Sequence, residues 1–234
     1  MIDGLKIGVV VPSAGRGMRM GGKQKQLLEI CGKPVLAYSL EAFEQSPLID
    51  AITVVTNRES ISKVEEIVRK KSLAKINHVI EGGEQRQDSV WNGLRMLEQE
   101  QIDVVLVHDA ARPFVTDEII SRVITAAMQF KAAIVAVPSK DTIKIADDSA
   151  FVQDTPKRDN CWLIQTPQAF NYRLLYQAFQ KAYSDNYYGT DEACIVERFG
   201  VRVKIVAGNY ENIKITTPED LEIAQLIAKK RVSG

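Results

Sequence analysis

The sequence predicts an α/β protein in which helices cover both faces of a mostly parallel, mixed sheet, giving three layers. Short apolar runs alternate with amphipathic stretches along the chain, which is the order expected when helices join neighbouring parallel strands. The runs are rich in β-branched residues and nearly continuous, as in strands that are buried on both faces. The length of 234 residues suits one domain of this class, so a single domain is expected over 1–234.

The strands are expected where the apolar runs occur. They cover residues 7–11, 52–55, 76–80, 104–107, 132–137 and 201–206.

Two stretches between and after these runs predict helices. Apolar residues recur at helical spacing between 120 and 127, which places one apolar stripe on the sheet. The segment 217–220, Thr-Pro-Glu-Asp, predicts a helix start with Thr217 as the N-cap, and this last helix is expected to run to about residue 228.

One segment does not follow the alternation. Residues 139–160 are polar and contain two short strand-like pieces, at 142–145 and 151–153. A polar hairpin of two strands has too few core residues to be stable by itself. We therefore expect 139–160 to form an arm that protrudes from the domain.

The charge balance and the cysteines exclude several classes of protein. Lys plus Arg and Asp plus Glu each number 30, so the net charge is zero, whereas a protein that coats nucleic acid would be basic. Cys31, Cys161 and Cys194 form no C-x-x-C pair or Cys/His cluster, which argues against a zinc site and favours a reducing compartment. No leader pattern or membrane-length apolar run is visible. We expect a cytoplasmic protein that binds neither nucleic acid nor a membrane.

A glycine-containing loop, Pro-Ser-Ala-Gly-Arg-Gly-Met-Arg-Met over 12–20, directly follows the first predicted strand. Small residues let the backbone approach a ligand, and glycines allow several N–H groups to point at one phosphate. Arg19 and Lys25 can add positive charge there. The loop fits neither common nucleotide motif, because Met20 replaces the last glycine of G-x-G-x-x-G and Gln24 replaces the Ser/Thr of the P-loop. We interpret it as a phosphate-binding loop of another kind; a plain βα turn is the alternative.

A second group of candidates follows the predicted strand 104–107. An acid at the carboxyl end of such a strand faces the ligand crevice of the sheet, which is where Asp109 lies. Asp109 could hold Mg²⁺, which prefers carboxylate and phosphate oxygens, or could be a capping or loop residue. Arg112 could bind a phosphate bidentately or form a surface ion pair. His108 has no metal partner in sequence and is interpreted as structural.

Three further loops carry candidate binding groups. Gly83 lies in a Gly-Gly-Glu turn after the strand 76–80, where glycines let the backbone meet a flat base edge, although composition alone indicates only a βα turn. Thr190 precedes a predicted helix at 193–199 and is either its N-cap or a ligand for an anion or polyol. Lys214 interrupts an apolar strand-like stretch, where burial of its charge is unfavourable unless it faces a charged ligand.

Together these motifs resemble the 2-C-methyl-D-erythritol 4-phosphate cytidylyltransferase family, whose members are nucleotidyltransferases with a Rossmann-like fold. The resemblance extends from end to end of the chain. Its motifs lie at 12–20, 25–26, 81–90, 108–113, 141–142, 166–168, 190–192 and 212–214. Family members usually have Ala where Ser13 stands and often Asp where Glu84 stands, and these two departures keep the size and the charge, respectively.

The resemblance implies transfer of CMP from CTP to 2-C-methyl-D-erythritol 4-phosphate, with pyrophosphate released and Mg²⁺ bound near Asp109, as a step of isoprenoid precursor synthesis. The implied catalytic residues are Arg19, Lys25, Arg158 and Lys214. The residues implied to bind CTP are Pro12, Ser13, Ala14, Gly15, Gly17, Gly83, Glu84, Ser89 and Ala110. The residues implied to bind the acceptor are Asp109, Arg112, Thr142, Arg158, Thr166, Thr190 and Lys214.

The resemblance also implies a homodimer in which the arm 139–160 embraces the second subunit. Arg158 belongs to this arm, and whether it serves its own site or that of the other subunit stays open. Lys23 lies close to Lys25, so which of these two lysines meets phosphate stays open as well.

Four other functions fit part of the pattern. A ribitol-5-phosphate cytidylyltransferase would share the CTP loop and differ in the polyol pocket, and the segment 108–113 favours the methylerythritol family on resemblance alone. A sugar-1-phosphate nucleotidyltransferase usually has a longer chain. The incomplete glycine fingerprint and the lack of an acid after the second strand argue against an NAD-binding oxidoreductase. Retention of the charged site residues argues against a non-catalytic nucleotide-binding regulator.

Overall fold

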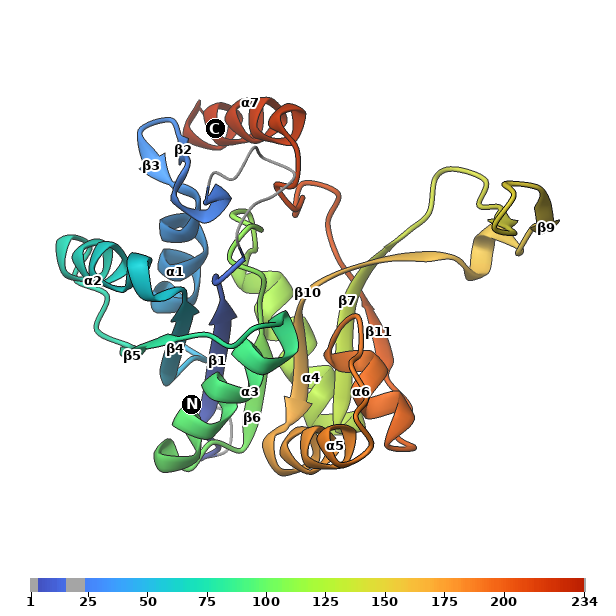
Figure 1. Ribbon diagram of the computed structural model, residues 1–234. Helices are drawn as coiled ribbons and strands as arrows, with labels where there is room; N and C mark the ends of the chain where they lie inside the picture. The colour runs from blue at the N-terminus through green and yellow to red at the C-terminus, as the bar shows by residue number, and fades with distance from the viewer. Residues whose placement is uncertain (1–3, 16–23, 234) are drawn as a thin grey trace.

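The computed structural model describes residues 4–15 and 24–233. Its centre is a seven-stranded sheet in the order β11-β7-β10-β6-β1-β4-β5 (Figure 1). All neighbouring strands pair in parallel except β10, which runs antiparallel to both β6 and β7. The strands are β1 (Ile7–Pro12), β4 (Ala51–Thr56), β5 (Ile76–Glu81), β6 (Val104–Val107), β7 (Ala132–Pro138), β10 (Trp162–Asn171) and β11 (Lys204–Ala207).

Helices cover both faces of the sheet, so the predicted three-layer fold is confirmed (Figure 1). One face packs on α1 (Val35–Gln45), α2 (Ile61–Lys70) and α4 (Asp117–Phe130). The other packs on α3 (Arg86–Leu97), α5 (Tyr172–Ser184) and α6 (Glu192–Arg198). Val9 and Val10 of β1 belong to opposite apolar clusters because successive side chains of a strand point to opposite faces. This explains why the strands read as continuous apolar runs.

The last helix, α7 (Pro218–Ser233), packs with the short hairpin of β2 (Glu29–Ile30) and β3 (Lys33–Pro34) over a small apolar cluster at one end of the molecule. Its predicted start is confirmed. The Thr217 hydroxyl accepts a hydrogen bond from the Asp220 N–H, and the Asp220 carboxylate accepts from the N–H groups of Thr216 and Thr217. The helix extends past the predicted end at about residue 228.

Among the seven strands of the central sheet, β10 is the one that the apolar pattern did not reveal. Its middle contains Gln165, Thr166 and Gln168, which are buried but polar, and its register with β7 shifts between Ile164 and Gln168. The strand β11 is also shorter than predicted, since it begins at Lys204 and residues 201–203 have no strand pairing.

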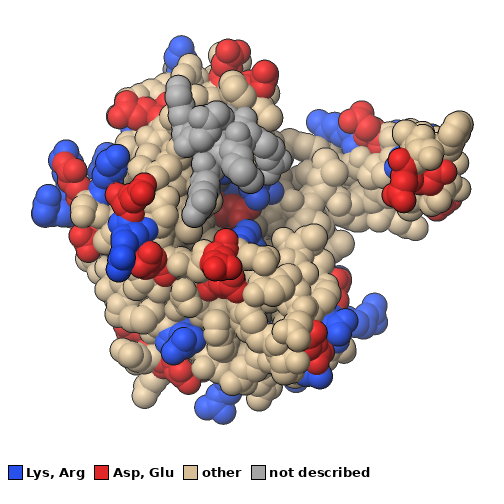
Figure 2. All heavy atoms as spheres, viewed as in Figure 1, with Lys and Arg blue, Asp and Glu red and all other residues tan. Residues whose placement is uncertain are grey.

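Between β7 and β10 the chain leaves the body and forms an arm (Figure 1). Near its tip β8 (Ile145–Ala146) pairs antiparallel with β9 (Val152–Asp154), a little later in the chain than the predicted pieces. Figure 2 shows the arm standing clear of the body, with acidic and basic groups interspersed on it. Apolar side chains are exposed here as well, and Phe151 has 72% of its surface in solvent.

His108 follows β6 and is fully buried, in agreement with its interpretation as structural. Its ring lies edge-on to Phe43, and its two nitrogens contact the carbonyl of Arg112 at 3.0 Å and the hydroxyl of Thr166 at 3.1 Å. The Thr166 hydroxyl also accepts the Asp109 N–H at 3.0 Å. A neutral His108 ring, which donates to the Arg112 carbonyl and accepts from the Thr166 hydroxyl, is compatible with all three hydrogen bonds. Burial lowers the pKa of His108 to about 4.

The lowered pKa of His108 predicts a pH-dependent loss of stability. As the pH falls through 6.5, the usual value for His, the unfolded chain takes up a proton that the folded protein excludes until about pH 4. The free energy of unfolding should therefore fall on acidification by up to about 1.4 kcal/mol per pH unit from this group. The free energy of unfolding in urea should therefore depend less steeply on pH between pH 5 and pH 6 in His108→Gln than in the unchanged protein, by about this amount. An equal dependence on pH in the two proteins would contradict the prediction.

Candidate active site

A cavity of about 460 Å³ opens at the carboxyl ends of the central parallel strands. Its walls come from the loops after β1, β4, β5 and β6, from the short 3-10 helix Lys25–Leu27, and from the segment before α7. It brings together a large part of the predicted site. The predicted residues that line it are Pro12, Ser13, Ala14, Gly15, Lys25, Gly83, Glu84, Ser89, Asp109, Ala110 and Lys214.

The loop after β1 is tied to the sheet at its first residue. The backbone N–H and the hydroxyl of Ser13 both donate to the carbonyl of Val55, at 2.6 and 3.1 Å. The Gln26 amide donates to the Ser13 carbonyl at 2.7 Å, which joins the loop to the segment that carries Lys25. The loop therefore enters the cavity from a fixed point. Gly17, Arg19 and Lys23 lie outside the described residues.

Gly82 and Gly83 form a wall that only glycine can make. A Cβ atom at Gly82 would lie 2.6 Å from the Ser89 hydroxyl and 2.8 Å from the Cβ of Ala14, and one at Gly83 would lie 2.2 Å from the Cβ of Asp88. The Ser89 hydroxyl accepts from the Gly83 N–H at 3.2 Å and donates to the Gln85 carbonyl. Glycine is thus required for the close approach of this turn to the β1 loop and to the start of α3.

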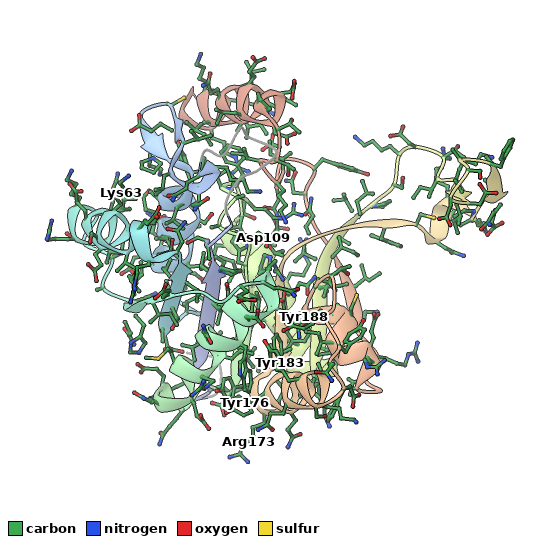
Figure 3. The ribbon with its side chains drawn as sticks, in the orientation of Figure 1. Lys63, Asp109, Arg173, Tyr176, Tyr183 and Tyr188 are labelled. Atoms are coloured by element: carbon green, nitrogen blue, oxygen red, sulfur yellow. The ribbon has the colours of Figure 1, made fainter. Side chains whose placement is uncertain are left out.

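Asp109, labelled near the centre of Figure 3, lines the cavity, and both of its carboxylate oxygens contact cationic side chains. Its Oδ2 is 2.6 Å from Lys214 Nζ, and its Oδ1 accepts from Arg86 at 3.2 Å. Arg112 Nε is further away, at 3.9 Å from Oδ2. Burial by itself raises the pKa of this carboxyl, but Arg86, Lys214 and Arg112 hold that pKa well below its usual range. Asp109 therefore stays ionised at neutral pH.

Lys214 reaches the cavity from an irregular segment, and the strand expected around it is absent there. The segment is fixed by its neighbours. The Ile215 N–H donates to the Ala111 carbonyl at 2.9 Å, and the Arg112 guanidinium donates to the carbonyls of Asn212 and Ile164. Arg112 is buried, and burial lowers its pKa. It supports the segment that carries Lys214 and does not line the cavity.

Besides Arg112, four predicted acceptor-binding residues lie outside the cavity lining. Thr166 is buried next to Asp109, to whose N–H it is bonded. Thr190 is exposed and contacts Cys194 Sγ at 3.2 Å. It is not the N-cap of α6, because Asp191 has that role and accepts from the Cys194 N–H at 3.0 Å.

The other two, Thr142 and Arg158, lie between β7 and β10 and are exposed. They come from the arm segment, away from the cavity of this chain.

Sequence reasoning missed two charged residues of the site, Arg86 and Glu192. The Arg86 guanidinium donates to both oxygens of Glu192, at 2.6 and 3.1 Å, while it also contacts Asp109. Burial lowers the pKa of Arg86, but the two carboxylates outweigh it and raise that pKa above its usual value. Both residues lie inside motifs quoted for the family resemblance, yet spacing gives no sign that two helix starts 106 positions apart meet.

The described residues fit a divalent cation only as part of a nucleotide complex. No three His, Cys, Asp or Glu side chains within 4–15 and 24–233 are grouped so that they could hold a metal ion alone. Asp109 is a single carboxylate, already paired with Arg86 and Lys214. Mg²⁺ commonly takes one or two carboxylates plus phosphate oxygens and water. This donor set fits an ion that arrives with a triphosphate and does not fit a permanent metal cage.

No helix in the described part of the chain is both long enough and apolar enough to span a lipid bilayer.

The chain is similar to curated proteins over almost its whole length. It is 44% identical over 227 residues to the 2-C-methyl-D-erythritol 4-phosphate cytidylyltransferase of Geobacter metallireducens, covering 95% of this chain and 97% of the relative. It is 46% identical over 228 residues to the enzyme of the same name from Caldanaerobacter subterraneus subsp. tengcongensis, covering 97% and 100%.

Solved structures agree with the sequence relatives. The 4-diphosphocytidyl-2C-methyl-D-erythritol synthase of Anaerococcus prevotii superimposes with a TM-score of 0.86 at 36% identity, covering 97% of this chain and 98% of that one. The 2-C-methyl-D-erythritol 4-phosphate cytidylyltransferase of Thermus thermophilus gives 0.78 at 30% identity, covering 96% and 100%. The model of the family 2-C-methyl-D-erythritol 4-phosphate cytidylyltransferase (IspD) matches residues 7–230, and the chain therefore belongs to this family of cytidylyltransferase enzymes.

Proposed function

We propose that this chain transfers CMP from CTP to 2-C-methyl-D-erythritol 4-phosphate, releasing pyrophosphate and giving 4-diphosphocytidyl-2-C-methyl-D-erythritol, as a step of isoprenoid precursor synthesis. Family membership supports the reaction. The observation that carries the proposal is the cavity at the strand ends, in which Lys25 and the pair of Asp109 and Lys214 share one space with the glycine-lined turns. Such a space suits two phosphorylated substrates.

The nucleotide is proposed to lie against the β1 loop and the turn after β5. The close wall of Gly82, Gly83 and Ser89 leaves backbone groups to meet the base, because no side chain can intervene there. Glu84, at the edge of the cavity, keeps the charge that the family pattern usually has at that position. The residues proposed for CTP are Pro12, Ser13, Ala14, Gly15, Gly17, Gly83, Glu84, Ser89 and Ala110.

The acceptor phosphate is proposed to lie next to Lys214, on the side of Asp109. Lys214 has 37% of its side chain exposed and its ammonium is fixed at 2.6 Å from Asp109, so a phosphate oxygen can replace water on it without moving the charge. The residues proposed for the acceptor are Asp109, Arg112, Thr142, Arg158, Thr166, Thr190 and Lys214. Of these, Thr142 and Arg158 of the arm are proposed to serve the site of a second subunit.

The reaction requires no general base. The acceptor phosphate is ionised at neutral pH and attacks the α-phosphorus of CTP in line with the departing pyrophosphate. The protein contributes by holding both phosphates in line and by neutralising charge that develops in the transition state. Arg19 and Lys25 are proposed to act on the α-phosphate and pyrophosphate, and Lys214 and Arg158 on the attacking phosphate.

Enzymes of this family generally use a divalent cation. Mg²⁺ bound with CTP, close to Asp109, would neutralise triphosphate charge, and Asp109 is the described carboxylate proposed to hold it.

One assay tests the proposed reaction. The protein is mixed with CTP, Mg²⁺ and either 2-C-methyl-D-erythritol 4-phosphate, ribitol 5-phosphate or no acceptor, and pyrophosphate is measured. Pyrophosphate should appear with the methylerythritol substrate. Release with ribitol 5-phosphate instead would show the other polyol specificity, and no release with any acceptor would favour a non-catalytic nucleotide-binding protein.

Loss of a cation that touches the triphosphate should slow the chemical step. We expect Lys25→Ala and Arg19→Ala each to lower kcat by about 10²–10³-fold, as for removal of one preorganised charge, with the fold retained. Lys63→Ala and Arg173→Ala are matched controls, since Figure 3 shows both residues at the periphery, far from Asp109. Turnover close to that of the unchanged protein at saturating CTP would refute these roles.

We also propose that the arm joins two copies of the chain into a homodimer in the cytoplasm. Phe151, Val152 and Ile145 expose 72%, 60% and 48% of their surface on an arm that has no apolar core of its own. Exposed apolar groups gathered on one segment are typical of an interaction site.

The dimer can be tested by sedimentation at micromolar concentration. Phe151→Asp should shift the chain from dimer towards monomer, because a charge would be buried in the contact. Phe130→Asp, which changes another exposed apolar residue at the far end of α4, should leave the dimer intact. A monomer for the unchanged protein would contradict the proposal.

A further inference from the structure

Arg86 links Glu192 to Asp109 across three elements of the fold. Arg86 is the first residue of α3 and Glu192 the first residue of α6, while Asp109 follows β6. The Arg86 guanidinium contacts the two carboxylates through two adjacent edges. The Nη atoms donate to Glu192 at 2.6 and 3.1 Å, and Nε and Nη2 lie 3.2 Å from Asp109 Oδ1. A planar fork with five donors can make this double bridge, and a lysine cannot.

Each end of the bridge is fixed independently. At α6, the Gln168 amide of β10 donates to the Asp191 carboxylate at 2.8 Å and accepts from the Ala193 N–H at 3.1 Å, which holds the helix start that carries Glu192. At α3, the Gln87 side chain contacts the backbone of Tyr187 and Gly189 in the loop before α6. The guanidinium therefore has little freedom to move.

Glu192 is 1% exposed, and its carboxylate pairs with Arg86. A buried carboxylate is unfavourable unless it is paired. The Glu192 carboxylate places a negative charge next to the positive charge of Arg86. Three cations, Arg86, Arg112 and Lys214, surround Asp109; Glu192 pairs with Arg86, and Asp109 Oδ2 lies 2.6 Å from Lys214.

We propose that Arg86, held by Glu192, is a positioning residue that fixes the Asp109 carboxylate so that Oδ2 presents Lys214 to the phosphate of the acceptor. The inference rests on the proposed function and adds two residues to it. Without Glu192, the guanidinium would be free to turn its full fork onto Asp109 and take both of its oxygens. Lys214 would then lose its anchor.

The first test is a double-mutant cycle. Glu192→Gln should lower kcat/KM for 2-C-methyl-D-erythritol 4-phosphate by at least about tenfold, with the KM for CTP changed by less than about twofold. In a Lys214→Gln background the same change should have less than about a twofold effect, because the anchored group is already gone. Effects that multiply would overturn the inference and would indicate direct contact of Arg86 with the substrate.

The second test separates positioning from stability. Removing Glu192 alone leaves a buried, unbalanced charge, which destabilises a fold, whereas Arg86→Gln with Glu192→Gln removes both charges. The double variant should regain a Tm close to that of the unchanged protein and should keep a loss in kcat/KM, because Asp109 Oδ1 then has no guanidinium to hold it. Activity that returns together with Tm would overturn the inference. Asp185→Asn, which breaks the ion pair with Arg198 between α5 and α6, is the matched control and should retain activity.

A third measurement does not depend on the reaction. In a crystal structure of Glu192→Gln, Asp109 should have turned towards Arg86 and its contact with Lys214 should be lost. A retained contact would overturn the inference even if the cycle could not be measured. An unchanged protein that releases no pyrophosphate would instead contradict the proposed function, so the two failures are distinguishable.

Discussion

The site is organised around one buried carboxylate at the end of a central strand. Asp109 is surrounded by three cations, and its ionised form is stable because they outweigh the effect of burial. Lys214, Arg86 and Arg112 come from three different parts of the chain, and each has a second partner or is tied to a neighbouring segment. The loop before α7, the start of α3 and the end of strand β6 are thereby held in one arrangement.

Much of the fold can be predicted from the sequence because a sheet that is covered by helices on both faces needs strands that are apolar throughout. Every residue of a strand such as β6 faces a helix layer, so the strand must be apolar throughout, and its sequence shows it. Strand β10 is an exception, because it is buried but partly polar. Its polar side chains at 165, 166 and 168 are buried but bonded to Asn209, His108 and Asp191, so their polarity has been compensated by partners that the sequence cannot place.

The same distinction explains which site residues could be predicted. Residues that directly follow a strand, such as Ser13 and Asp109, share an edge of the sheet by topology alone, and they do line the cavity. The contact between Arg86 and Glu192 depends on where two helices begin, and no periodicity encodes that. The sequence predicts that Lys214 faces a charged ligand; in the structure its charge is paired with Asp109 of the same chain, and the segment around it is not a strand.

The direction of β10 has a consequence for how members of this family can be recombined. Because it runs against its neighbours, its first residues lie where theirs end, so it passes from the arm directly to the region beside Asp109. One strand thus continues from the end of the arm to Thr166, which is buried beside Asp109 but does not line the cavity. A hybrid protein that exchanges the arm 139–160 between two relatives would need its second crossover at Cys161, the single residue between the arm and this strand, because a later crossover would also replace residues beside Asp109.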